Sequence, residues 1–96
     1  MNELINRRIN QMLVHSYLYE MAGKPIISDN LWDNWAKELA VLLKDNPEAL
    51  KEHPYGEAFK DWTGDTASIL IPYFDDTIKH RAQLAYFCAK GERLYD

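Results

Sequence analysis

Three side chains in one short stretch could bind a charged aromatic ligand. Asp29 and Asp33 are four residues apart, and Trp32 lies between them. On a helix, residues four apart lie on the same face, one turn apart. A flat cationic ring would find an aromatic platform there, with carboxylates at its rim. A purely structural explanation stays open: the helix dipole favours Asp in a first turn by about 0.3–1 kcal/mol, and Trp32 can simply pack two helices together.

Patterns typical of catalysis or metal binding are weak in this sequence. His15, His53 and His80 are widely separated, with no pair four residues apart, and Cys88 is the only cysteine. That distribution does not fit the spacing of a metal site, and no order of Ser, His and Asp indicates a catalytic triad. We therefore expect no enzyme, no required cofactor and no metal, with Cys88 as a buried structural thiol.

Length and composition predict a single small domain. The chain has 96 residues, 47% of them hydrophobic and 27% charged, which suits one core and not two. A net charge of -4 argues against the basic surface of a nucleic-acid binder. The single cysteine fits a reducing compartment. No apolar run approaches the roughly 20 residues that span a bilayer, and no signal-peptide pattern follows the first residues. A cytoplasmic protein with no nucleic-acid or membrane partner is the expectation.

The elements that must position the ligand-binding residues are predicted to be helices. A first helix is expected over about residues 2–21, ended by Gly23 and Pro25. A second, with Ser28 as its N-cap, is expected over 29–43. On the first helix, three- and four-residue spacing predicts a buried face of Ile5, Ile9, Met12, Leu13, Ser16 and Tyr17. On the second, the predicted stripe is Leu31, Trp35, Leu39 and Leu42, with Trp32 and Leu43 at one edge.

The remaining chain is predicted to be an irregular connector over 44–71, followed by a C-terminal helix over 72–91. Thr63 to Thr66 indicate a turn, and 67–71 carry the sole strand signal, equally consistent with a buried approach to the last helix. Pro72 suits the start of that helix and Gly91 its end. Its predicted apolar face consists of Phe74, Ile78, Leu84, Ala85 and Cys88.

We therefore predict an all-α single domain over 1–96, in which the C-terminal helix packs across an antiparallel helical hairpin. Two charges interrupt the predicted apolar faces, Glu20 on the first helix and Arg81 on the last. A charge on such a face needs a partner or an edge position that reaches water. A Glu20–Arg81 pair, an edge position for each, or an exposed Arg81 in a docking surface are the alternatives.

Residues 4–43 are more specific than two helices require, and they resemble the N-terminal domain Ia of NAD-dependent bacterial DNA ligases. The resemblance covers less than half of the chain, has no gap, and does not extend beyond Asn46. It is carried by the runs His15-Ser16-Tyr17-Leu18-Tyr19, Lys24-Pro25-Ile26-Ile27-Ser28-Asp29-Asn30-Leu31-Trp32-Asp33 and Lys37-Glu38-Leu39.

The resemblance implies a site for the nicotinamide mononucleotide (NMN) half of NAD. By position, Tyr19 and Trp32 would sandwich the nicotinamide, and Asp29 and Asp33 would hold the ribose region. The family places a histidine near the phosphate at the position of Glu20. A carboxylate there repels phosphate, so the departure implies either another pose or weakened or lost binding of NAD and NMN.

Ligase chemistry itself is not expected. The family uses a lysine nucleophile in a Lys-x-Asp-Gly motif, and the nearest sequence here, over 60–64, lacks that spacing. The best hypothesis is a non-catalytic binding module for a nicotinamide nucleotide or a protein partner. The alternative is a small interaction or regulatory protein, possible in a phage or other mobile element, that binds a host protein or a nucleic-acid-processing complex. A subunit supplying the NMN-binding domain to a split ligase is a third possibility.

Overall fold

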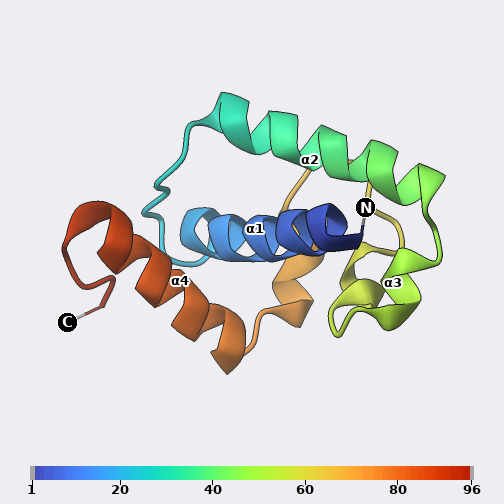
Figure 1. Cartoon of the computed structure of the whole chain (residues 1–96). Helices are drawn as coiled ribbons and strands as arrows, with labels where there is room; N and C mark the ends of the chain where they lie inside the picture. Colours follow the sequence, from blue (N-terminus) through green and yellow to red (C-terminus); the bar gives the residue numbers. More distant parts are fainter. Residues whose placement is uncertain (1, 96) are drawn as a thin grey trace.

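The computed structural model describes residues 2–95, and these form an all-α fold with no strand among them. Figure 1 shows α1 between α2 on one side and α4 on the other, with α3 and η1 near the N-terminal end of α1 and η2 packed alongside α1. In chain order the elements are α1 (Asn2–Glu20), α2 (Asp29–Asp45), α3 (Ala49–Glu52), the 3₁₀ helices η1 (Gly56–Phe59) and η2 (Ser68–Tyr73), and α4 (Asp76–Lys90).

The predicted helical hairpin is confirmed: α1 and α2 run antiparallel and pack together (Figure 1). Gly23 adopts a left-handed conformation with φ 65° just after α1, as a helix C-terminus favours. Ser28 caps α2 by accepting a hydrogen bond from the Leu31 backbone N–H at 3.1 Å. The predicted α1 face is buried in full, namely Ile5, Ile9, Met12, Leu13, Ser16 and Tyr17.

The buried faces of the other two long helices differ from the prediction. α2 buries the predicted Leu39 and Leu43, and Ala36 as well. The predicted Trp32, Trp35 and Leu42 pack half-buried against the core, and only Leu31, 37% exposed, departs from the predicted stripe. α4 buries Ile78, Ala82 and Tyr86 against the far side of α1.

The predicted α4 face was therefore wrong at two of its positions, because Leu84 is 54% exposed and Cys88 is exposed. The expectation of a buried Cys88 thiol was wrong as well. No described helix is both long enough and apolar enough to cross a membrane.

The segment 44–71, predicted as an irregular connector, contains the last two residues of α2, then α3 and η1, and the first part of η2, where most of the strand signal lies. The C-terminal helix begins four residues later than predicted, because Pro72 belongs to η2 and Asp75 is the N-cap of α4. The Asp75 carboxylate accepts hydrogen bonds from the Ile78 backbone N–H at 2.9 Å and from the Tyr55 hydroxyl at 2.8 Å. These bonds fix where α4 starts.

The segment between η1 and η2 is fastened to the side of α2. Trp62 is 8% exposed, and its indole N–H donates to the Ala36 carbonyl at 2.9 Å. Gly64, with φ 83°, lies so close that a Cβ there would be 2.8 Å from the same carbonyl oxygen. This close approach holds residues 65–67 next to the start of α2, where the candidate site is located.

Candidate functional site

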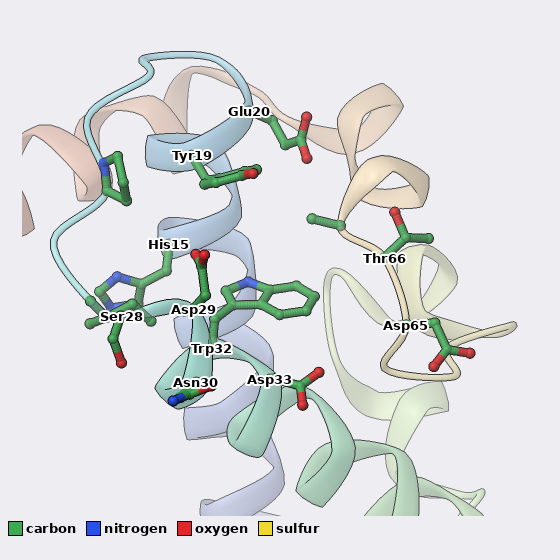
Figure 2. Close-up of a pocket in the computed structure, with 13 residues that line it drawn as sticks. His15, Tyr19, Glu20, Ser28, Asp29, Asn30, Trp32, Asp33, Asp65 and Thr66 are labelled. Atoms are coloured by element: carbon green, nitrogen blue, oxygen red, sulfur yellow. The ribbon is translucent and has the colours of Figure 1, made fainter.

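A cleft of about 460 Å³ lies between the C-terminal end of α1, the N-terminal end of α2 and the segment that leads into η2. Its size is within the roughly 300–1,000 Å³ typical of small-molecule sites. Figure 2 shows its side chains converging from these three parts of the chain. The lining residues are His15, Tyr19, Glu20, Pro25, Ile27, Ser28, Asp29, Asn30, Trp32, Asp33, Asp65, Thr66 and Ala67.

All five residues that the sequence singled out for binding line this one cleft. Tyr19 and Glu20 come from the last turn of α1, and Asp29, Trp32 and Asp33 from the first turns of α2. In Figure 2 the Tyr19 ring lies above the Trp32 indole, with the Asp29 carboxylate beside the space between them. Tyr19 is 54% exposed, so its ring is available to a ligand. The two helices thus present one aromatic ring each to the same space.

Contacts with α1 and with Trp62 hold the Trp32 ring in a fixed orientation. Its indole N–H donates to the Ser16 hydroxyl at 3.1 Å, and Ser16 is fully buried in α1. Trp62 meets Trp32 edge to face, with ring centroids 6.1 Å apart. A buried polar group that is hydrogen-bonded and an edge-to-face ring contact both favour one rotamer. Trp32 is therefore a preorganised platform.

The carboxylates of the cleft are unequally neutralised. Asp33 forms an ion pair with Lys37 one turn along α2, at 2.7 Å, and this hydrogen bond raises the pKa of Lys37. Within residues 2–95, no ion pair involves Glu20, Asp29 or Asp65. Three of the carboxylates that line the cleft thus form no salt bridge within the described residues, and the charge of Asp65 contributes to the raised pKa of Lys37.

His15 lines the cleft but was not predicted to belong to it. Its Nδ1 is buried without a hydrogen-bond partner, and its ring packs against Trp35 with centroids 5.6 Å apart. Burial lowers the pKa of His15 from its ordinary value of 6.5, which keeps the imidazole neutral at pH 7. The sequence carried one relevant signal, since His15 is one turn before Tyr19 on α1.

The wall formed by Asp65, Thr66 and Ala67 was also missed. The sequence showed only a turn at 63–66, more than 30 residues from Trp32. Its place in the cleft depends on the Trp62 and Gly64 contacts with α2, which no local pattern indicates. This wall lies outside residues 4–43, so the cleft also depends on the part of the chain beyond the resemblance.

The proposed Glu20–Arg81 pair is wrong. Arg81 is exposed, and its guanidinium donates to the Asn10 side-chain oxygen at 3.3 Å. Asn10 and Glu20 are ten residues apart on α1, about 15 Å at 1.5 Å per residue. Glu20 is exposed at the end of α1. Both charges therefore reach water, as an edge position for each predicts, and an exposed Arg81 in a docking surface stays a prediction.

The arrangement suits non-covalent recognition of a flat cation. The two rings offer π faces, and carboxylates surround them, which together attract a positively charged aromatic ligand. No group of three side chains that could hold a metal ion exists among the described residues. No family model, no curated protein and no solved structure matches this chain.

Proposed function

We propose that this protein is a non-catalytic binding module that recognises the oxidised nicotinamide ring in the cleft between α1 and α2. The observation that carries the proposal is the shared cleft of Tyr19, Trp32, Asp29 and Asp33. These are the residues that the resemblance to domain Ia of NAD-dependent DNA ligases assigns to the nicotinamide and ribose regions. The charge of the oxidised ring fits carboxylates around an aromatic platform.

Glu20 makes the binding of a phosphorylated ligand weak. Its carboxylate belongs to the cleft lining, at the position where the family has a histidine near the phosphate. Two like charges about 4 Å apart repel each other by about 4 kcal/mol at an effective dielectric of 20. That repulsion is enough to remove micromolar affinity. The proposed module is therefore a weak NMN binder or has lost NMN binding.

Calorimetry and protein-observed NMR test the proposal directly. A nicotinamide ligand should shift the Trp32 indole N–H resonance, because this ring forms the platform. Trp32→Ala should weaken binding by about 1–3 kcal/mol, the range measured for an aromatic stacking partner. Tyr55→Phe is the control, because Tyr55 is more than 20 positions from Trp32 in the sequence and does not line the cleft. A nicotinamide ligand that binds without disturbing Trp32 would place the site elsewhere.

A second candidate is a small interaction protein whose partner docks on the outer face of α4. Leu84 and Phe87 are each 54% exposed there, and Tyr95 is 40% exposed. These side chains line a hollow of about 310 Å³ with Leu94. Exposed apolar and aromatic side chains are typical of protein interfaces. If this face binds a protein, Leu84→Ser combined with Phe87→Ser should abolish that binding and leave the cleft resonances unchanged.

A further inference from the structure

The charged side chains that line the cleft are acidic. Four carboxylates line it, from Glu20, Asp29, Asp33 and Asp65. No lysine or arginine is among the lining residues of the described chain. The four carboxylates come from α1, from α2 and from the segment before η2. In Figure 2 they lie on several sides of Tyr19 and Trp32. A phosphate attached to a ligand inside this cleft therefore has carboxylates, and no lysine or arginine, among the side chains that line its surroundings.

The basic groups nearest in sequence are committed elsewhere. Lys24, in the connector between α1 and α2, directs its ammonium to the Leu94 carbonyl at 3.4 Å and over the Tyr86 ring, 5.9 Å from its centroid. Lys37 is bound to Asp33. His15 is neutral at pH 7 because burial lowers its pKa. None of the three offers a free positive charge to a phosphate.

The N-terminal end of α2 does not supply one either. A helix N-terminus attracts anions through its free N–H groups and its dipole. Here the Ser28 hydroxyl already accepts from the Leu31 N–H, and Asp29 supplies a carboxylate in the first turn. One N–H of the helix end is thus bound to the chain's own acceptor, and the chain's own carboxylate lies in the first turn, so a ligand phosphate would have to compete with both.

We propose that the cleft selects a pyridinium nucleoside without phosphate, of which nicotinamide riboside is the simplest member, over the corresponding 5′-phosphate, NMN. This inference rests on the proposed function and names its ligand class. The nucleoside keeps the cationic ring that stacks on Trp32 and the ribose hydroxyls that can donate to carboxylates. It lacks the group that the cleft repels. The ordering is the reverse of the one that NMN recognition requires.

Titration of the full chain with three probes separates ring, charge and phosphate. The probes are neutral nicotinamide, nicotinamide riboside and NMN, measured by calorimetry and by the Trp32 indole N–H resonance at low ionic strength. The riboside should bind at least tenfold tighter than either of the others. The difference between riboside and NMN should shrink as salt is added, because salt screens the repulsion between partly exposed charges.

A matched pair of double variants tests whether the cleft carboxylates cause the preference. Glu20→Gln with Asp65→Asn removes two negative charges from the lining, and both residues are exposed, so the fold should persist. This variant should bind NMN at least tenfold tighter than the wild type does, and bind the riboside more weakly. Glu48→Gln with Glu57→Gln removes the same charge from surface pairs outside the cleft. It should leave both affinities within about twofold of the wild type.

The other outcomes are distinguishable. NMN binding as tight as that of the riboside overturns the inference and leaves the proposed function standing; loss of that binding in Lys37→Gln would identify Lys37 as the overlooked cation. Neutral nicotinamide binding as tightly as the riboside also overturns it, because the charge would then not matter. If no probe moves the Trp32 resonance, the proposed function fails and the inference fails with it.

Discussion

The two ends of α1 carry hollows of similar size and opposite character. The cleft at the C-terminal end presents two aromatic rings and three unpaired carboxylates. The hollow at the N-terminal end, of about 520 Å³, is lined by Asn6, Asn10, Ala49, Glu52, His53, Pro54, Tyr55 and Arg81. One is anionic and aromatic, and the other contains the guanidinium that the first lacks.

The hollows differ most in how far their polar groups are already satisfied. In the second hollow, His53 Nδ1 accepts from the Tyr55 backbone N–H at 3.0 Å, and the Tyr55 hydroxyl donates to Asp75. Arg81 donates to Asn10. These groups hold α3, η1 and α4 to α1. Among residues 2–95, the exposed side chains of Glu20, Asp29 and Asp65 in the cleft make no such bonds. Carboxylates that are free of protein partners at an open site are available to a ligand, so we expect the cleft to be the binding site and the second hollow a structural junction.

The largest expected effect tests the junction. Gly56 begins η1, and a Cβ there would collide with the Leu50 backbone carbonyl, which cannot move without unfolding α3. Gly56→Ala should lower the free energy of unfolding by about 3 kcal/mol, the upper part of the range for overpacking. Urea denaturation measures it. Gly91→Ala is the control: its φ is 68° but nothing lies within 4 Å, so only the loss of about 1–2 kcal/mol from the left-handed backbone is expected. Equal losses would show that the junction tolerates rearrangement.

The corresponding glycine of the cleft should matter for binding as well as for stability. Gly64→Ala combines a φ of 83° with a Cβ that would lie 2.8 Å from the Ala36 carbonyl oxygen. We expect a loss of about 1–2 kcal/mol from the left-handed backbone, with a further loss from the close contact. The added side chain should push residues 65–67 away from α2 and so displace one wall of the cleft. The affinity for nicotinamide riboside should therefore fall as well. Gly56→Ala, measured under conditions where it is folded, should leave that affinity unaltered.

Glu20→His restores the residue type that the resemblance places near a phosphate, and it should tighten NMN binding at least tenfold, or about 1.4 kcal/mol. The change removes one negative charge from the cleft and adds an imidazole that can donate a hydrogen bond. Calorimetry compares it with Arg81→Ala, which should have no effect because Arg81 lies at the other hollow. Weaker NMN binding in Arg81→Ala would contradict the separation of the two hollows.

The smallest effect is a pH dependence of stability shared by the two regions. Burial lowers the pKa of His15 in the cleft, and burial together with the Arg81 charge lowers the pKa of His53 in the junction. The unfolded chain then binds protons near pH 6.5 that the folded chain does not. The free energy of unfolding should therefore keep its full value above about pH 6.5 and decrease as the pH falls below it. Urea midpoints at pH 7.5 and 5.5 measure this decline, and His53→Gln should reduce it. A midpoint that rises on acidification would contradict both shifts.

The α1–α2 hairpin could be predicted because its signals are local. The α1 face repeats at three and four residues from Ile5 to Tyr17, and Gly23 and Ser28 mark the turn chemically. The α4 face could not be predicted from apolarity, because Leu84 is more apolar than Ala82, yet Ala82 is the buried residue. α4 packs closely on α1, so a small side chain fits the contact while a larger one is turned outward.

The candidate site likewise combines residues that local sequence signals predict with residues that only long-range contacts bring to it. Its two aromatic rings and three of its four carboxylates come from residues 19–33, a stretch with a recognisable spacing, and they do line one cleft. Asp65 joins them through the bond of the Trp62 indole to Ala36, across 26 residues, and through the close approach of Gly64 to the same residue. Residues 44–71 contain only short helices, which long-range contacts stabilise more than their own sequence does. Their positions were therefore beyond sequence reasoning.

The edge-to-face contact of Trp32 with Trp62 gives the cleft an optical signature of its own. Two indoles held in a fixed mutual orientation couple their electronic transitions, so they should dominate the near-ultraviolet circular dichroism of the folded chain. Trp35 makes a tilted ring contact with His15 and has the Arg8 guanidinium over its face, so it should emit separately. A pyridinium is an electron acceptor, and one that settles on Trp32 should quench the emission of the coupled pair. Occupancy of the cleft could then be followed by light alone, without a label on the protein or the ligand.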